Sequence, residues 1–366
     1  MCGVVMGNSL THGGNITEIA TRFKKEPHEI IDFSANINPI GLPKGIIETI
    51  TQNINKICYY PDPKCTELTN ELAEYLGLKA ENILIGNGSM EFIYIIPPTF
   101  KPERVLIVAP TFIEYELVTR VHGAELEFCI CKERDNFEIN VDRIVKHLPN
   151  IDMMFICNPN NPTGYVLAKE KLKFLASGCS KNEVMLVVDE TFINFLEDED
   201  EFTVMHNLTD ILIVLRSFTK FFALPGLRLG YLISSERAVQ KIKKFQPVWS
   251  VNTLAQAVGK EIISNKQYIE NTKRLIHNQL AFLQTQLATI RVIKVFPSVT
   301  NFILCKFNKV LNYNEIYETL IAEHNIVVRN CSNFRGLTNR YFRVAVRSEK
   351  ENEKLVTALK DILGET

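Results

Sequence analysis

Long apolar runs and an excess of charge are both missing from this sequence of 366 residues. No apolar run approaches the roughly 20 residues that a membrane-spanning helix needs. The N-terminus has no basic segment followed by an apolar core, so we expect no secretory signal. The formal net charge is only −1, which argues against a broad basic surface for nucleic acid or anionic lipid. We therefore predict no nucleic-acid partner and no membrane partner.

The cysteines form no metal-binding pattern. None of the nine stands in a Cys-x-x-Cys pair, and none has the Cys/His spacing of a zinc site. An odd number of cysteines in a chain without a predicted signal indicates reduced thiols and a cytoplasmic location. Hydrophobic residues at 46% and charged residues at 23% are ordinary for a globular enzyme.

Strand-like and helix-like segments alternate from residue 82 onward. The expected strands are 82–85, 105–108, 125–131, 153–157, 185–188 and 211–215, and the expected helices between them are 90–97, 111–122, 142–147 and 169–177. Continuous apolar strands in such an alternation predict an α/β fold with a mainly parallel sheet, covered on both faces.

The remaining segments suggest a second, smaller lobe. Its expected strands are 292–295, 301–306, 326–329 and 341–346, with helices at 313–324 and 349–363. We predict four parts: an N-terminal arm that belongs partly to the small lobe (1–43), a large domain (44–250), a bridging helix (251–289) and a C-terminal α+β domain (290–366).

Polar residues follow several of the apolar strands. Gly86-Asn87-Gly88, Asn161, Asp189 and Lys220 all stand at predicted carboxyl ends, where open parallel sheets bind their ligands. A lysine is rarely buried without a partner, and condensation of its amine with an aldehyde would explain this one. A single lysine at the end of a strand is more often a solvated surface residue than a catalytic one. The neighbouring motifs must therefore decide whether Lys220 is catalytic.

Three motifs supply that decision. Asn160-Asn161-Pro162-Thr163-Gly164, then Asp189, then Ser217-x-x-Lys220 with Arg228 eight residues later, occur in this order after successive strands. Together they resemble the fold-type I enzymes that use pyridoxal 5'-phosphate (PLP), and the resemblance covers almost the whole chain. It implies an aspartate aminotransferase-like fold, with a seven-stranded sheet in the large domain.

The resemblance assigns cofactor contacts to particular residues. Lys220 would form the Schiff base with PLP and later move protons at Cα, Asp189 would pair with the pyridine nitrogen, and Asn161 would hydrogen-bond the ring 3-oxygen. An isolated Asp at a strand end could instead be a cap, and an isolated Asn-Pro a turn. The other residues that it assigns to the cofactor are Gly88, Ser89, Met90, Ser217, Thr219 and Arg228 around the phosphate, Phe112 stacked on the ring, and Tyr60 reaching the phosphate of a homodimer partner.

The resemblance also implies a substrate that carries both a carboxylate and a phosphate. Arg343 and Asn161 would hold the carboxylate. His12, Asn36 and Arg329 would hold the phosphate, and Ser34 could add a hydroxyl.

Two branches of these enzymes carry the layout closely: histidinol-phosphate aminotransferases and the threonine-phosphate decarboxylases of cobalamin synthesis. Segments 12–15, 32–39 and 215–228 look like the decarboxylases. Phe192 stands where the aminotransferases usually place a tyrosine. We expect decarboxylation of O-phospho-L-threonine, or of O-phospho-L-serine, which lacks one methyl group. The alternatives are the aminotransferase reaction and an inactive protein of this fold that serves as a binding module, against which the intact lysine, aspartate and arginine argue.

Overall fold

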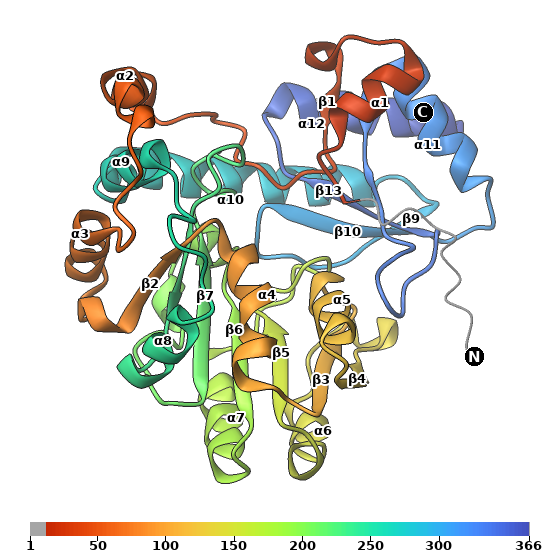
Figure 1. The fold of residues 1–366 in the computed structure, drawn as a ribbon. Helices are drawn as coiled ribbons and strands as arrows, with labels where there is room; N and C mark the ends of the chain where they lie inside the picture. The colour runs from red at the N-terminus through yellow and green to blue at the C-terminus, as the bar shows by residue number, and fades with distance from the viewer. Residues whose placement is uncertain (1–11, 366) are drawn as a thin grey trace.

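A seven-stranded sheet forms the centre of the larger lobe in the computed structural model, which describes residues 12–365 (Figure 1). The strand order is β2-β8-β7-β6-β5-β3-β4. In this sheet β8 runs antiparallel to both of its neighbours, β2 and β7, and all other neighbouring strands are parallel. The strands are β2 Ile83–Gly86, β3 Arg104–Ala109, β4 Glu125–Ile130, β5 Met153–Cys157, β6 Met185–Asp189, β7 Leu212–Ser217 and β8 Gly230–Ile233. The expected mainly parallel, seven-stranded sheet is confirmed.

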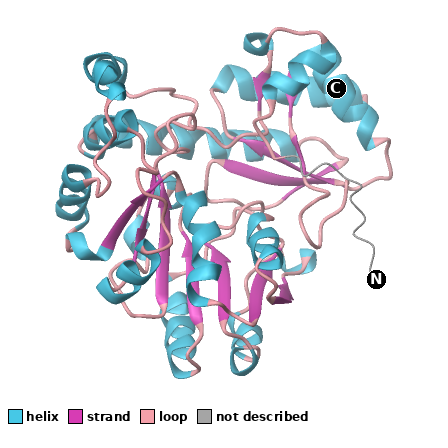
Figure 2. Cartoon of the chain, in the orientation of Figure 1, coloured by secondary structure: helices cyan, strands magenta, loops and turns pink. Residues whose placement is uncertain are grey.

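Apolar residues pack on both faces of this sheet, as its uninterrupted apolar strands predict. Along β5, Met154 and Ile156 belong to one hydrophobic cluster, whereas Met153 and Phe155 belong to the other. Helices flank the sheet (Figure 2). They are α3 Thr66–Leu76, α4 Ser89–Phe100, α5 Glu114–Val121, α6 Val141–Val145, α7 Lys169–Lys181 and α8 Glu236–Lys243. Helix α2 Ile46–Asn53 lies apart from the sheet (Figure 1).

The expected bridging helix over 251–289 is instead two helices, α9 Thr253–Ile263 and α10 Lys266–Ala288. Asn265 lies between them, and its side chain accepts a hydrogen bond from the backbone N–H of Tyr268 at 3.1 Å. Asparagine is favoured at such N-cap positions, so α10 starts anew there. The domain boundaries at residues 43, 250 and 289 remain a proposal.

The smaller lobe contains a four-stranded antiparallel sheet in the order β12-β13-β10-β9. Its strands are β9 Ile293–Val295, β10 Phe302–Phe307, β12 Arg329–Asn330 and β13 Tyr341–Ala345, and its helices are α1 Ile16–Phe23, α11 Tyr313–His324 and α12 Glu349–Leu363. Near the chain start, β1 Ile31–Asp32 pairs in parallel with β11 Ile326–Val327. The N-terminal segment therefore lies beside the C-terminal helices (Figure 1).

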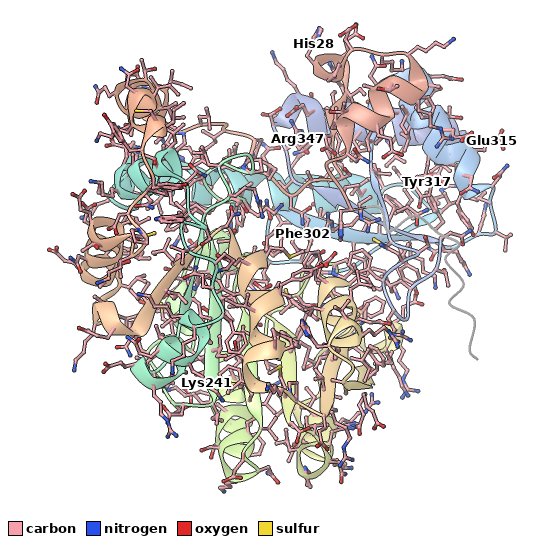
Figure 3. All side chains as sticks on the ribbon, in the orientation of Figure 1. His28, Lys241, Phe302, Glu315, Tyr317 and Arg347 are labelled. Atoms are coloured by element: carbon pink, nitrogen blue, oxygen red, sulfur yellow. The ribbon has the colours of Figure 1, made fainter. Side chains whose placement is uncertain are left out.

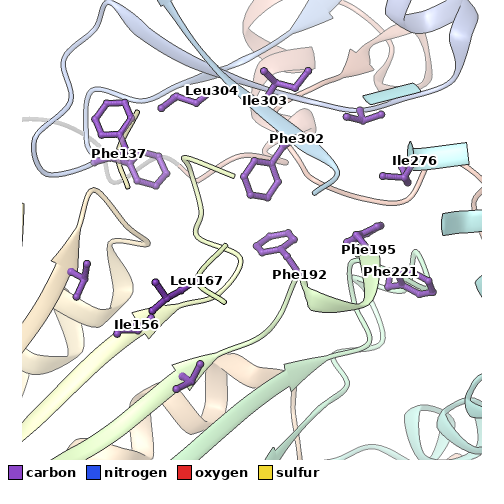
Figure 4. Close-up of a cluster of buried hydrophobic side chains, with 14 of the residues drawn as sticks. Phe137, Ile156, Leu167, Phe192, Phe195, Phe221, Ile276, Phe302, Ile303 and Leu304 are labelled. Atoms are coloured by element: carbon purple, nitrogen blue, oxygen red, sulfur yellow. The ribbon is translucent and has the colours of Figure 1, made fainter. Parts of the chain in front are cut away.

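Aromatic side chains join the two lobes. Phe302, at the start of β10, lies where the small sheet meets the large lobe (Figure 3). Its ring meets the edge of Phe192, with 4.9 Å between the ring centroids. Phe195 and Ile276 lie nearby (Figure 4). This packing is part of one hydrophobic cluster that includes residues from both lobes, so it fixes the strand ends of the large sheet relative to β10 and β13.

Two further findings bear on the expected partners. Across residues 12–365, no helix is long and apolar enough to cross a membrane. Within the same range, no group of three or more His, Cys, Asp or Glu side chains could hold a metal ion.

Candidate active site

A cavity of about 410 Å³ opens where the carboxyl ends of β5, β6 and β7 face the small lobe. Its wall contains every site residue expected from the sequence except Gly88 and Tyr60. Those in the wall are His12, Ser34, Asn36, Ser89, Met90, Phe112, Asn161, Asp189, Ser217, Thr219, Lys220, Arg228, Arg329 and Arg343. Residues from four distant parts of the chain therefore meet in one place.

Asp189 lies at the end of β6 with both carboxylate oxygens already oriented. One oxygen accepts from the Tyr115 hydroxyl at 2.7 Å, and the other accepts from the backbone N–H of Thr191 at 3.0 Å. Burial raises the pKa of Asp189, and these hydrogen bonds oppose that effect. Such a carboxylate could accept a hydrogen bond from a cationic ring nitrogen. Tyr115 lies within the predicted helix 111–122, and no sequence pattern distinguishes it there from a residue that packs on the sheet.

Lys220 follows β7 and faces the cavity. Burial, and then the positive charges of Arg343 and Arg228, lower the pKa of its amine to about 8. About a tenth of Lys220 is therefore uncharged at pH 7, far more than for an ordinary lysine, and the uncharged amine is the form that attacks an aldehyde.

An anion cradle lies at the start of α4. Gly88 precedes the helix with a φ of 75°, and a Cβ at this position would lie 2.8 Å from an Arg228 guanidinium nitrogen. A Cβ at Gly230 would lie 2.4 Å from the Ser89 backbone nitrogen. Helix N-terminal amides beside an arginine and the Ser217 hydroxyl suit a phosphate. Gly88 therefore supports the cradle through its missing side chain, although it is not part of the cavity wall.

Two arginines face each other on the small sheet. The expected strand 326–329 is split at Val328, so Arg329 begins β12 and pairs directly with Arg343 on β13. Both side chains are buried, and burial lowers both pKa values, that of Arg343 to about 10. Like charges directly opposite each other destabilise a sheet. The pair is therefore suited to an anionic ligand that would offset the repulsion.

The remaining hydrogen-bonding atoms near this pair are partly unused. Arg343 donates to the Asn161 side chain and to the Ser34 carbonyl oxygen. Its Nε and the Oδ1 of Asn36 are buried without a partner. The Ser34 hydroxyl, in contrast, donates to Asp32 at 2.6 Å and accepts from the Gly14 N–H at 2.8 Å. Ser34 could therefore offer a ligand only a remaining lone pair.

Two aromatic residues occupy contrasting places. Phe112 lines the cavity, and its ring centroid lies 5.7 Å from that of His12 and 5.7 Å from that of Tyr115. Tyr60 is 78% exposed and stacks on Trp249 with 4.2 Å between ring centroids. Tyr60 is thus outside the cavity of its own chain.

The cavity at the carboxyl ends of β5, β6 and β7, the anion cradle at α4 and the buried Lys220 together define a PLP-dependent enzyme of fold type I. The chain belongs to the aminotransferase class I and II family, whose sequence pattern matches residues 28–359, and it uses PLP. It is 35% identical to the threonine-phosphate decarboxylase of Salmonella typhimurium over 96% of both chains.

Two solved structures are close in fold. The histidinol-phosphate aminotransferase of Clostridium acetobutylicum has a TM-score of 0.84 and 33% identity, and the match covers 91% of this chain and 98% of the other. The L-threonine-O-3-phosphate decarboxylase of Porphyromonas gingivalis has a TM-score of 0.81 and 27% identity, with 91% and 99% covered. The relatives thus include both branches expected from the sequence.

Proposed function

We propose that the protein decarboxylates O-phospho-L-threonine to (R)-1-aminopropan-2-yl phosphate, the linker of the cobamide nucleotide loop. O-phospho-L-serine, which would give ethanolamine phosphate, is the close analogue. The observation that carries the proposal is the buried Arg329–Arg343 pair, a second anion site in addition to the cradle at α4. A cofactor phosphate in the cradle would leave this pair for a substrate with two anionic groups. The similarity to the Salmonella decarboxylase supports the same substrate class.

The residues of the cavity wall would hold the cofactor in the way that the family suggests. Asp189 would bind the ring nitrogen, Asn161 the 3-oxygen, and Phe112 would stack on the ring. Ser89, Met90, Ser217, Thr219 and Arg228 would surround the phosphate. Bound PLP supplies an electron sink for the bond that breaks at Cα.

Substrate orientation would select the bond that breaks. Arg343 and Asn161 would hold the carboxylate, while Arg329, His12 and Asn36 would hold the phosphate. Anchoring both ends would fix the orientation of the Cα–carboxylate bond, and the right orientation would favour loss of CO₂ over loss of a proton. Lys220 would then give a proton to Cα. Its lowered pKa suits it to both proton uptake and release near neutral pH.

A homodimer would complete the site. Exposed apolar side chains around Tyr60 support this proposal. Ile57 and Tyr59 are close to it in sequence, Trp249 stacks on it, and Val248 is the chain neighbour of Trp249. In the dimer, Tyr60 would reach the cofactor phosphate of the partner. We propose the cytoplasm as the location, because the cysteines of residues 12–365 are free thiols.

Histidinol-phosphate aminotransferase is the second candidate, favoured by the fold of the Clostridium enzyme. Phe192 weighs against it. The Phe192 ring is buried against Phe302 and lines the cavity. It lacks the hydroxyl that the tyrosine usual at this position of the aminotransferases would provide.

A direct assay separates the candidates. The PLP-loaded enzyme is incubated with O-phospho-L-threonine, with O-phospho-L-serine, and with histidinol phosphate plus 2-oxoglutarate. We expect CO₂ and an amino phosphate from a phosphoamino acid, with the threonine compound preferred. A single methyl group is worth only about 1–3 kcal/mol of discrimination, so the serine compound should react measurably. Glutamate formation from histidinol phosphate without any CO₂ release would replace this proposal with the aminotransferase.

A further inference from the structure

A buried carboxylate lies directly behind His12. The Nε2 of His12 is 2.7 Å from one oxygen of Glu114, and the Tyr94 hydroxyl donates to the other oxygen at 2.7 Å. The Glu114 side chain is only 6% exposed, whereas that of His12 is 43% exposed. The neighbours Ile113 and Tyr115 line the cavity together with His12, but Glu114 does not. The imidazole therefore separates this carboxylate from the cavity.

The protonation of Glu114 decides how His12 can behave. The hydrogen bond with His12 lowers the pKa of Glu114; burial opposes this effect, and the hydrogen bond from Tyr94 adds to it. Ionised Glu114 can only accept hydrogen bonds, so Nε2 of His12 must carry a proton. In a neutral imidazole with that proton, Nδ1 is an acceptor. Both nitrogens are donors only when the ring is positively charged.

A phosphate needs donors and positive charge. A neutral His12 would present the Nδ1 lone pair to the phosphate. The negative charge of Glu114 behind the ring would then repel the phosphate. A carboxylate at hydrogen-bond distance favours the charged imidazole. The same contact therefore sets the ring orientation and favours its second proton.

We propose that Glu114, held by Tyr94, is a positioning residue that keeps His12 doubly protonated and makes it a cationic donor to the substrate phosphate. This inference rests on the proposed function, because it assigns His12 to that phosphate. It adds Glu114 and Tyr94 to the phosphate end of the site as a support built entirely from the large lobe.

The other charges around the cavity act in opposite directions. Those in its wall are the cations Lys220, Arg228, Arg329 and Arg343 and the carboxylate Asp189, and Asp32 lies behind Ser34. The four cations disfavour a further positive charge on His12. Glu114 offsets them in the free enzyme, and a bound phosphate dianion would do so more strongly.

Glu114→Gln tests the charge while preserving the contact, because the amide oxygen can still accept from Nε2. The PLP-loaded enzyme, with the cradle at α4 already filled, is examined at pH 6 and pH 8. At pH 8 we expect KM for O-phospho-L-threonine and the Kd of inorganic phosphate to rise about tenfold, the loss expected for one charge-assisted hydrogen bond. At pH 6 the increase should shrink, because His12 can be protonated without Glu114. kcat should change less than KM.

Nitrogen NMR of the histidine rings reads the protonation directly. In the wild type with phosphate at pH 8, both His12 nitrogens should give the signals of a protonated ring, and in Glu114→Gln they should give those of a neutral ring. Tyr94→Phe should shift the same signals in the same direction by less. Phosphate binding and NMR need no turnover, so they still report on Glu114 if the decarboxylation proposal fails.

Glu127→Gln is the matched control, because Glu127 contacts His147 at 2.9 Å outside the cavity. It should leave KM and phosphate affinity unchanged. An equal loss of phosphate affinity at pH 6 and pH 8 in Glu114→Gln would mean that Glu114 only supports the fold. If that variant does not fold, a singly protonated His12 in the wild-type phosphate complex at pH 8 would overturn the inference by itself.

Discussion

The two walls of the cavity differ in how far their polar groups are already satisfied. On the large-lobe wall, Asp189 has two donors and the Ser217 hydroxyl lies 2.8 Å from that of Thr219. On the small-lobe wall, Arg329 and Arg343 face each other as like charges, their guanidinium groups donate to neutral carbonyl and amide oxygens, and the Arg343 Nε has no partner. The large-lobe wall therefore suits a ligand that remains bound, such as a cofactor. The small-lobe wall suits a ligand that binds and is released in each turnover, such as a substrate. The unpaired positive charges on the small-lobe wall destabilise the free enzyme, and binding of an anionic substrate would remove this destabilisation.

The largest effect should follow from removing the amine of the large-lobe wall. Lys220→Ala should lower kcat by at least about 10²–10⁴-fold, because proton transfer at Cα loses its donor. The visible absorbance of the PLP-loaded enzyme should also change. Lys241→Ala is the control, since Lys241 lies over the Phe100 ring and is not part of the cavity wall. An unchanged absorbance band in Lys220→Ala would show that another group holds the cofactor.

The contrast between the walls also explains what the sequence could predict. Asn161, Asp189 and Lys220 each come directly after an apolar strand, so their convergence follows from the parallel sheet. Glu114 and Tyr115 lie within a helix, where nothing in the pattern separates a site contact from packing. The pairing of Arg329 with Arg343 depends on a strand split at Val328, which the continuous apolar run 326–328 conceals. Antiparallel β8 was missed because it follows the Arg228 loop without an intervening helix.

Replacing one small-lobe arginine with a neutral residue should weaken substrate binding without a matching loss of protein stability. Arg329→Met keeps much of the volume and removes the like charge opposite Arg343. We expect KM for the phosphoamino acid to rise about 10- to 100-fold, as for the loss of a hydrogen bond to a charged group. The Tm of the substrate-free enzyme should stay nearly level, because relief of the like-charge contact offsets the loss of the hydrogen bonds that Arg329 donates to the Asn330 carbonyl and the Asn333 side chain.

Arg340→Met is the control for the contrast between the effects of Arg329→Met on KM and on Tm. Arg340 donates to the carbonyl oxygens of Phe307 and Asn308 outside the cavity, so its loss should lower Tm and leave KM unchanged. If Arg329→Met lowered Tm as much as Arg340→Met does, the small-lobe wall would not be holding unmet charge.

On the large-lobe wall, loss of a single donor should affect the cofactor and stability together. Tyr115→Phe leaves one Asp189 oxygen without its hydroxyl partner, which costs about 1–3 kcal/mol of stability. We expect the Kd of PLP to rise about tenfold, because Asp189 becomes easier to protonate. The readouts are Tm and a cofactor titration. Tyr165→Phe, which loses a 3.2 Å contact with Glu138 outside the cavity, should leave the Kd of PLP unchanged.

The smallest effect concerns a contact outside the cavity that connects the two lobes. Glu133 follows β4, and its carboxylate meets Lys306 at 2.7 Å, Tyr341 at 2.7 Å and Lys294 at 3.3 Å. These three residues form one row across β13, β10 and β9. Burial opposes ionisation, but the hydrogen bonds from the row prevail and lower the pKa of Glu133 to about 2.

Glu133→Gln should therefore destabilise the protein in a pH-dependent way. A carboxyl whose folded pKa is depressed adds stability above its ordinary value of about 4.3 and loses it as the pH falls toward 2. Because the Glu133 side chain is 30% exposed, solvent screening limits the effect to about 1 kcal/mol or less. The Tm difference from wild type should be clear at pH 7 and smaller at pH 3. Glu138→Gln, whose carboxylate contacts Lys171 within the large lobe, should show little difference at either pH. A Glu133→Gln difference that grew at pH 3 would mean that the row does not hold an ionised carboxylate.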